Sequence, residues 1–267
     1  MIDLERIVPL KPDGTATPVY CVHASSGSAY SYLGLASLLG DRPVYGIEAP
    51  GFDGDREPVH SLPLLSAEYV ETLRAFQPEG DFVLLGWSLG GLVAFDMAQR
   101  LAEAGRPPRQ LIMIDVSTQW EVVQVPPERE IAGRFLHDML ATVGAPTSAV
   151  QTILAALPED ADGAAVFTEA ERCGALPEEL DADLLGDGYP VFRAHMEAMC
   201  DYVITGSYAG PVVHLITAES LMEYMRWENV MPNLTEHIVP GGHYSIWSGD
   251  SLRYVSELVR SALAEAD

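Results

Sequence analysis

The turn Gly86–Gly91, with the sequence GWSLGG, constrains this chain more than any other feature. It directly follows the apolar run 81–86 (DFVLLG) and opens a helical pattern that extends from Leu89 to about Ala104. A serine with glycine two residues before and two residues after it, between a strand and a helix, is typical of a sharp turn that presents the hydroxyl above a sheet. Larger side chains at the glycine positions would collide with the neighbouring strand and helix. We therefore take Ser88 as the candidate nucleophile.

Short apolar runs alternate with helical patterns along most of the 267 residues, which predicts an α/β protein with a mostly parallel sheet flanked by helices. The whole chain, 1–267, is predicted to form a single domain. Ser66 is expected to cap the second helix. The expected strands are 18–23, 43–47, 81–86, 110–115, 211–217 and 235–239, and the expected helices are 30–39, 67–77, 89–104 and 250–264.

Between Asp115 and Pro211 this alternation stops. A stretch of this length is too long to be a plain connection in a compact domain. We interpret about 118–210 as a helical lid subdomain over the strand ends, with a subdomain that only stabilises the sheet as the alternative. Helices are expected there at 127–143, 148–157, 164–173 and 190–202, and the acidic segment 177–188 (PEELDADLLGDG) is expected to be a loop.

The composition argues against several classes of function. With 15 basic and 39 acidic residues the net charge is −24, so we expect neither a nucleic-acid partner nor a membrane partner. Lys11 is the only lysine and lies in a Pro/Gly-rich segment, which argues against Schiff-base chemistry. The sequence has no secretory signal and no apolar run of about 18 residues, and its three cysteines lack zinc-binding spacing. We therefore expect a cytoplasmic protein without a metal site.

A serine nucleophile at neutral pH needs a base, and the base needs a carboxylate that orients it. His243, in the loop sequence PGGH after the last expected strand, is the candidate base among seven histidines. Two acids follow expected strands, namely Asp115 in LIMIDVS and Glu219 in LITAES. Both have the right kind of position, and the place of Asp115 one strand away from Ser88 favours Asp115.

Acyl transfer to a serine also needs N–H donors for the developing oxyanion. The backbone N–H of Leu89, directly after the nucleophile, is one expected donor. The loop 23–28 (HASSGS) consists of small residues after its histidine, and we choose the Ser25 N–H as the second donor, with Ala24 as the near alternative. His23 at the end of the first expected strand is a possible substrate contact, and His214 inside an apolar strand is expected in the core.

Several segments, in the right order, carry a family resemblance: LKPDGTATPVYCVHASSGSAYSYLGLASLLGDRPVYGIEAPG, YVETLRAFQPEGDFVLLGWSLGGLVAFDMAQRLAEAG and LIMIDVS. Together they closely resemble the thioesterase domains of polyketide synthases and nonribosomal peptide synthetases. The resemblance covers most of residues 8–117, returns at PGGHYSIW and is weaker across 118–210. It implies an α/β-hydrolase fold, with the helical lid inserted after the strand that ends at Asp115. It also implies a triad of Ser88, His243 and Asp115, which supports Asp115 over Glu219.

The resemblance further implies the reaction. An acyl or peptidyl chain would arrive on the phosphopantetheine arm of an acyl or peptidyl carrier protein, or of an upstream synthase module. The chain would pass to Ser88 and leave by hydrolysis or macrocyclisation, with no bound cofactor or metal. GWSLGG and the lead LKPDG…PVYCVH look more like the terminal, type I kind than like a free-standing type II editing enzyme. A general carboxylesterase is a further alternative, whereas a non-catalytic binding protein is disfavoured because all three triad residues are present.

Two expectations concern the lid and the partner. The apolar positions Ile131, Phe135, Leu136, Met139 and Leu140 would either wall a water-poor chamber that favours cyclisation, or simply pack as a core stripe at helical spacing. Carrier proteins tend to be acidic, so a local arginine patch is expected near the mouth of the site. Arg106 and Arg109 are candidates for that patch because they lie close to the nucleophile helix in the sequence.

Overall fold

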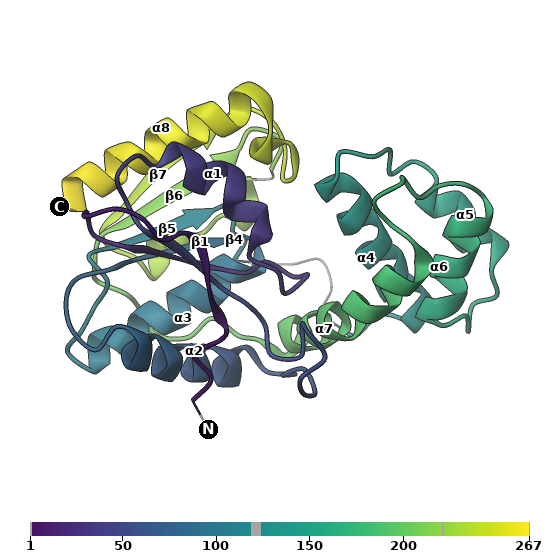
Figure 1. Ribbon diagram of the computed structural model, residues 1–267, viewed down its shortest axis with the longest axis horizontal. Coiled ribbons are helices and arrows are strands. Elements are labelled where there is room, and N and C mark those ends of the chain that lie inside the picture. Colours follow the sequence, from purple (N-terminus) through teal and green to yellow (C-terminus); the bar gives the residue numbers. More distant parts are fainter. Residues whose placement is uncertain (1, 119–123, 221, 267) are drawn as a thin grey trace.

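The computed structural model describes residues 2–118, 124–220 and 222–266. Within these ranges seven strands form one sheet, in the order β1-β3-β2-β4-β5-β6-β7 (Figure 1). Only β1 pairs antiparallel with its neighbour, while the other described pairs are parallel, which confirms the mostly parallel sheet. The strands are β1 (Ile7–Lys11), β2 (Val19–Val22), β3 (Val44–Ile47), β4 (Val83–Trp87), β5 (Gln110–Ile114), β6 (Val212–Thr217) and β7 (Leu234–Val239).

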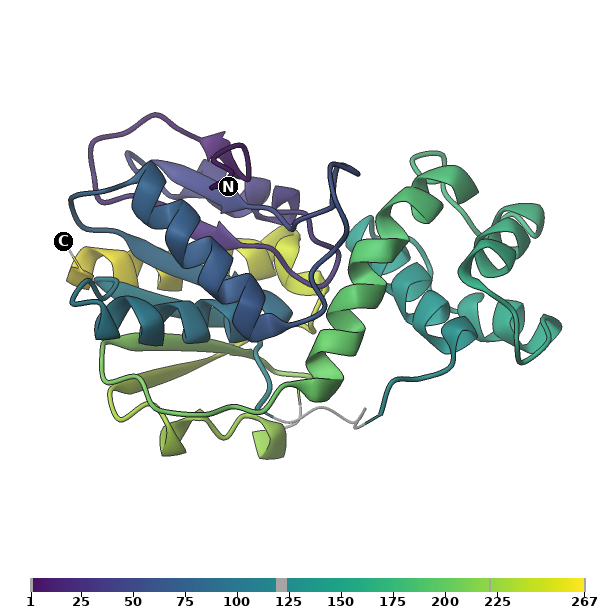
Figure 2. The same ribbon diagram turned by 90° about the horizontal axis from the view of Figure 1, so that it is seen from below.

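Helices cover both faces of the sheet. Helices α1 (Leu33–Leu38) and α8 (Gly249–Ala266) lie on one face, and α2 (Leu62–Phe76) and α3 (Leu89–Glu103) lie on the other (Figures 1 and 2). Successive strand residues point to opposite faces, so Leu84 joins the core under α2 and α3 while Leu85 joins the core under α1 and α8. This burial on both faces explains why the central strands are continuous apolar runs rather than alternating ones.

The described ranges also contain four short 3₁₀ helices. These are η1 (Tyr30–Tyr32), η2 (Met222–Tyr224), η3 (Trp227–Asn229) and η4 (Ser245–Trp247). The first precedes α1 directly, so the helix expected at 30–39 is present but begins as a 3₁₀ turn. The last lies between β7 and α8 and begins two residues after His243, so it shapes the loop that carries this residue.

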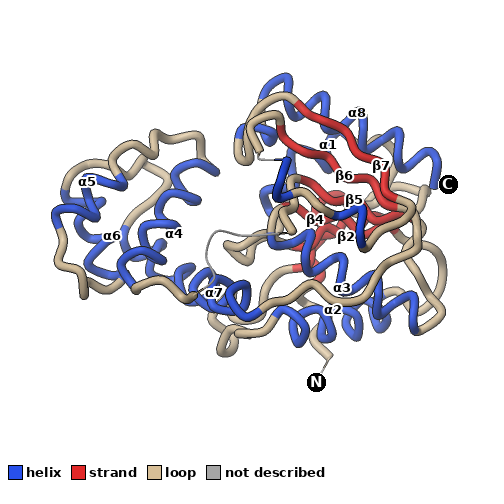
Figure 3. The backbone as a smooth tube through the Cα atoms, turned by 180° about the vertical axis from the view of Figure 1, so that it is seen from behind, coloured by secondary structure: helices blue, strands red, loops and turns tan. Residues whose placement is uncertain are grey.

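The four helices that the structure describes between β5 and β6 form what we call the helical insertion: α4 (Glu128–Thr142), α5 (Val150–Ala156), α6 (Gly163–Arg172) and α7 (Ala182–Asp201). Figures 1 and 3 show it on one side of the sheet, connected to it by α7. The insertion has its own apolar core, which includes Phe135, Phe167 and Phe192. The carboxyl-terminal end of α7 packs instead on the main core through Ala198 and Tyr202. Part of the predicted range 118–210, residues 119–123, lies outside the described residues.

The six predicted strands are present, and β1 is a further strand that the sequence pattern did not predict. Pro9 lies inside β1, and proline is tolerated in a strand at the edge of a sheet, which is where β1 lies. A run that contains proline therefore reads as a loop from the sequence alone, although here it pairs with β3, with Ile7 opposite Ile47.

Two predicted helix starts were wrong. Helix α2 begins at Leu62 after Ser61, so Ser66 does not cap it but lies inside it, where its hydroxyl donates to the Asp96 carboxylate. Helix α7 begins at Ala182, and part of the expected acidic loop is helical. Asp181 caps α7 by accepting a hydrogen bond from the Leu184 N–H at 2.7 Å. Tertiary packing of Leu185 and Tyr189 in the insertion core outweighs the helix-breaking tendency of Pro190.

Candidate active site

Ser88 lies on a strained turn between β4 and α3. Its backbone has φ 55° and ψ −128°, in a region that residues other than glycine rarely occupy. A Cβ at Gly86 would overlap the Gly90 carbonyl at the start of α3, and a Cβ at Gly90 would overlap the Val22 carbonyl of β2. The two glycines therefore allow strand and helix to meet at this angle. The Ser88 N–H donates to the Ile114 carbonyl at 3.0 Å, which ties the turn to the end of β5.

The His243 ring and the Asp115 carboxylate form a direct hydrogen bond. The distance from His243 Nδ1 to Asp115 Oδ2 is 2.6 Å, although 128 residues separate them in the sequence. Asp115 is almost fully buried, and its other oxygen accepts hydrogen bonds from the Thr217 N–H at 3.0 Å and from the Ser220 hydroxyl at 2.7 Å. Burial by itself would raise the pKa of Asp115. The hydrogen bonds and the charge of His243 outweigh this effect and lower the pKa below its usual value.

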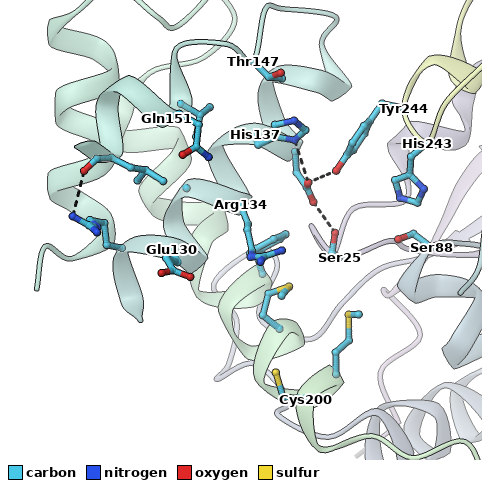
Figure 4. Close-up of a pocket in the computed structure, with 18 of the residues that line it drawn as sticks. Ser25, Ser88, Glu130, Arg134, His137, Thr147, Gln151, Cys200, His243 and Tyr244 are labelled. Atoms are coloured by element: carbon cyan, nitrogen blue, oxygen red, sulfur yellow. Dashed lines mark hydrogen bonds and ion pairs between the residues drawn. The ribbon is translucent and has the colours of Figure 1, made fainter. Parts of the chain in front are cut away.

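This pairing fixes which nitrogen of His243 carries the proton. Nδ1 donates to the ionised Asp115, so the neutral ring keeps its lone pair on Nε2. The ring packs against the indole of Trp87, with the ring centroids 4.9 Å apart. Ser88 and His243 line the same pocket and face the same space (Figure 4). An imidazole with a free Nε2 beside a serine hydroxyl can act as a general base for nucleophilic attack.

The alternative acid, Glu219, lies in the same region but does not contact the His243 ring in the way that Asp115 does. Its carboxylate lies against Gly242, where a Cβ would overlap it, and its N–H bonds to the Gly241 carbonyl at 3.3 Å. Glu219 therefore packs beside the loop that carries His243, and the carboxylate that bonds to the His243 ring is that of Asp115.

Leu89 is the first residue of α3, so its N–H is one of the helix N-terminal donors without an intrahelical acceptor. The second expected donor lies on the loop after β2. There the Ala24 carbonyl accepts from His23 Nδ1 at 2.7 Å. In a trans peptide the Ser25 N–H points away from the Ala24 carbonyl, and therefore away from His23. Ser25 lines the pocket, whereas Ala24 is buried.

Two buried histidines lie under this loop. His23 and His195 stack with ring centroids 5.0 Å apart, and each is almost completely buried. Burial, with His195 close by, lowers the pKa of His23 to about 3, and burial lowers the pKa of His195 to about 4. His23 is therefore a neutral structural residue that also accepts from the Tyr69 hydroxyl, and the expectation that it contacts substrate was wrong. His214 is fully buried, as predicted.

The pocket has a volume of about 960 Å³ and lies between the strand ends and the helical insertion. Three helices of the insertion line it: α5 contributes Val150, Gln151, Leu154 and Ala155, and the other two helices, α7 and α4, differ in chemistry. Helix α7 contributes an apolar, sulfur-rich wall of Phe192, Met196, Met199 and Cys200, whereas α4 contributes a polar wall of Arg129, Glu130, Arg134, His137 and Asp138 (Figure 4).

The apolar chamber expected on α4 is absent from this pocket. Ile131, Phe135, Leu136 and Leu140 are buried in the core of the insertion, and Met139 packs against that core. Helix α4 is amphipathic, so its apolar stripe faces α5, α6 and α7 while its polar face lines the pocket. Of the two alternatives, core packing is confirmed and the chamber was wrong.

The expectation that Arg106 and Arg109 lie near the mouth of the site was also wrong. Arg106 lies over the Phe82 ring and donates to the Gly80 carbonyl, and Arg109 forms an ion pair with Asp81 at 3.1 Å. Arg109 immediately precedes β5, whereas Ser88 follows β4, and these strands are parallel. The two arginines therefore lie near the amino-terminal ends of the strands, whereas the pocket lies at the carboxyl-terminal ends. The arginines that do line the pocket are Arg129 and Arg134.

Several residues at the site itself were not predicted from the sequence. Trp87 and Tyr244 flank the nucleophile and the base in the sequence, so their adjacency was the available signal. Asp138 and His195 gave no such signal because they lie on insertion helices. Among the described residues no group of three or more His, Cys, Asp or Glu side chains is placed to hold a metal ion. None of the described helices is both long and apolar enough to cross a membrane.

The family model called Thioesterase domain matches residues 17–263. The chain belongs to the thioesterase domain family. Among curated relatives, the chain is 35% identical over 143 residues to malpibaldin synthetase of Mortierella alpina. That match covers 53% of this thioesterase domain and 3% of the synthetase, so the chain spans only a small part of that relative.

Solved structures agree with the fold. A four-domain nonribosomal peptide synthetase, holo-AB3403 bound to AMP and glycine, matches with a TM-score of 0.81 and 21% identity, over 96% of this chain and 20% of that chain. The type II thioesterase BorB, from a borrelidin biosynthetic cluster, matches with a TM-score of 0.74 and 18% identity, over 98% and 99% of the two chains. Together with the sheet order, these matches confirm the α/β-hydrolase fold.

Proposed function

We propose that this thioesterase domain releases an acyl or peptidyl chain from the phosphopantetheine arm of a carrier protein through an acyl-enzyme on Ser88. The observation that carries the proposal is the 2.6 Å hydrogen bond between His243 and Asp115 beside a strained serine that shares the pocket. Strain of this kind is tolerated where the surrounding structure needs the side chain in one place.

In the proposed reaction, Ser88 Oγ attacks the thioester carbonyl while His243 Nε2 takes the proton of the Ser88 hydroxyl. Asp115 stabilises the imidazolium that forms, and the N–H groups of Leu89 and Ser25 hold the oxyanion. The intermediate then collapses, the C–S bond breaks, and His243 returns the proton to the leaving thiolate. The products of this half-reaction are a free pantetheine thiol and an ester on Ser88.

We further propose that water is the main second nucleophile. The polar wall of α4 places charged side chains inside the pocket, and such a surface holds water rather than excluding it. His243 would deprotonate a water molecule, which attacks the ester and yields a free acid. Mass spectrometry of the released product distinguishes the outcomes, because ring closure gives a mass lower by one water than the acid.

Terminal release and editing of wrongly loaded carriers are two candidate roles. A pocket of about 960 Å³ is far larger than a short acyl group requires, which supports release of a longer chain. The fold similarity to BorB keeps editing as the second candidate. Turnover of a long-chain carrier thioester against that of an acetyl carrier thioester separates the two roles, because an editing enzyme is expected to prefer the acetyl form.

A fluorophosphonate probe tests the acyl-enzyme directly. Wild type is expected to be labelled and Ser88→Ala is expected to be neither labelled nor active, because the probe reacts only with an activated serine. Pantetheine thioesters should be cleaved faster than small oxoesters with the same acyl group. An active Ser88→Ala variant would contradict the mechanism, and a strong preference for oxoesters would favour a general carboxylesterase.

A further inference from the structure

Asp138 of the helical insertion reaches across the pocket to two loops of the sheet. One carboxylate oxygen accepts from the Ser25 hydroxyl at 3.1 Å, and the other accepts from the Tyr244 hydroxyl. Figure 4 draws both hydrogen bonds as dashed lines from the labelled Ser25 and Tyr244. Ser25 belongs to the loop after β2, and Tyr244 directly follows His243 in the loop after β7. One insertion carboxylate therefore contacts both loops that carry the proposed catalytic groups.

A second insertion helix contacts the same serine. His195, on α7, has its Nδ1 at 2.8 Å from the Ser25 carbonyl. Because a carbonyl only accepts, Nδ1 must carry the proton, and the ring donates while it stays neutral. Ser25 is thus held through its side chain by α4 and through its backbone by α7.

The insertion contacts combine with contacts from the sheet to restrain Ser25 on both sides of its N–H. The peptide plane before Ser25 is fixed from the sheet side, where the Ala24 carbonyl accepts from His23 Nδ1 and from the Gly27 N–H at 3.1 Å. The peptide plane after Ser25 is fixed by His195, and the side chain between them is fixed by Asp138. Two of these four contacts, those of Asp138 and His195, therefore come from the insertion.

We propose that the helical insertion completes the oxyanion site: Asp138 and His195 are positioning residues that fix the Ser25 N–H, and Asp138 also fixes the loop of His243 through Tyr244. This inference rests on the proposed function and goes beyond it. It assigns the insertion a role in positioning catalytic groups, in addition to covering the substrate. A misplacement of an oxyanion donor weakens transition-state stabilisation more than substrate binding.

The surroundings of Asp138 are consistent with its role in holding the two loops together. His137 lies 4.0 Å from the carboxylate, and the side chain of Asp138 is 19% exposed. Burial raises the pKa of Asp138, while the hydrogen bonds from Tyr244 and Ser25 act in the opposite direction. The Tyr244 ring packs at right angles to the His243 ring, with centroids 5.0 Å apart, so a shift of Tyr244 would also move the proposed base.

The test compares Asp138→Ala with Asp187→Asn in the full chain. Asp187 is an exposed carboxylate on α7, outside the pocket, and its variant is the control for loss of charge on the insertion. We expect Asp138→Ala to lower kcat on a pantetheine thioester by about tenfold to a hundredfold, with KM changed by less than about threefold, which is below the loss for removal of an oxyanion donor itself. Asp187→Asn should retain wild-type kcat.

His195 supplies a second, independent pair of variants. His195→Leu removes the donor to the Ser25 carbonyl, whereas the side-chain amide of His195→Asn can replace Nδ1–H. We expect His195→Leu to lower kcat about tenfold and His195→Asn to regain part of that loss. This pair keeps the proposal testable if Asp138→Ala fails to fold. Equal kcat values in His195→Leu and wild type would overturn the role of His195.

Labelling by the fluorophosphonate probe separates this inference from the proposed function. The rate of labelling should fall in Asp138→Ala in parallel with kcat, because the phosphonylated serine uses the same oxyanion donors. If wild type and Asp138→Ala are labelled equally fast with equal kcat, or if only KM changes, the inference is wrong and the proposed function stands. If wild type is not labelled at all, the proposed function fails and the inference fails with it.

Discussion

The sheet and the helical insertion contribute to the pocket in different ways. The sheet supplies Ser88, Asp115 and His243 from strand ends and the loops that follow them, and the two residues at strand ends have a backbone with positive φ, 55° for Ser88 and 49° for Asp115. The insertion contributes Asp138 and Arg134 to the pocket lining and holds the buried His195 behind it, all from regular helices, where the face of the helix decides what each side chain meets.

The contrast indicates that the sheet holds the catalytic groups and that the insertion orients them. Backbone strain at a strand end is stored by the packed sheet and holds a side chain rigidly. A helix face can shift with its helix, so its side chains are suited to orient a loop or to meet a variable substrate. We therefore expect substitutions on the sheet side to cost far more turnover than those on the insertion side.

The largest effect is expected for Asp115→Asn. The amide can no longer stabilise an imidazolium and favours the wrong tautomer of His243, so kcat should fall by roughly a thousandfold to ten-thousandfold. Glu219→Gln should stay within a few-fold of wild type, because its carboxylate packs beside Gly242. Steady-state hydrolysis of a pantetheine thioester measures both. A larger loss in Glu219→Gln than in Asp115→Asn would reverse the assignment of the acid.

The buried histidine pair should make stability depend on pH. The pKa values of about 3 for His23 and about 4 for His195 lie below the ordinary value near 6.5, so the unfolded chain binds more protons once the pH falls below 6.5. The stability contribution of the pair is complete above this pH and is lost as the pH falls toward the folded-state pKa values, about 4 for His195 and about 3 for His23. Between pH 7 and 5.5 we expect the free energy of unfolding to drop by about 1 kcal/mol for each histidine.

Urea denaturation at the two pH values measures this drop. His195→Asn removes one of the two titrating groups, so its free energy of unfolding should fall by about half as much over the same interval. An equal drop in the variant and in wild type would mean that His195 titrates normally in the folded protein, which would contradict its burial under the Ser25 loop.

The smallest expected effect belongs to Arg134. Its side chain is exposed on the polar wall, and phosphopantetheine carries a phosphate, so Arg134→Glu should raise KM for a phosphopantetheine thioester by roughly threefold to tenfold. An N-acetylcysteamine thioester lacks the phosphate and should show little change. Arg106→Glu is the matched control, because Arg106 lies near the amino-terminal ends of the strands, away from the pocket. An equal effect of both reversals would remove Arg134 as a specific contact.

The residues that the sheet brings to the pocket could be predicted from the sequence, for a physical reason. The carboxyl ends of parallel strands meet at one edge, so a serine after β4, an acid after β5 and a histidine after β7 were expected to converge. The hydrogen bond from His243 to Asp115 follows that expectation. His23 also follows a strand, yet it lies under α7, and no pattern in its own segment indicates this burial.

Three features follow from local sequence: the alternation of strands and helices, the glycines that permit the Ser88 turn, and the amphipathic character of α4. They depend on neighbours within a few residues or on strand order. Three other features depend on the folded arrangement: the face of α4 that meets the pocket, the position of Arg106 and Arg109 away from it, and the contacts of Asp138 and His195 with Ser25. The reason is that these facts depend on how the helical insertion docks on the sheet. That docking joins side chains more than a hundred residues apart, and no local pattern records it.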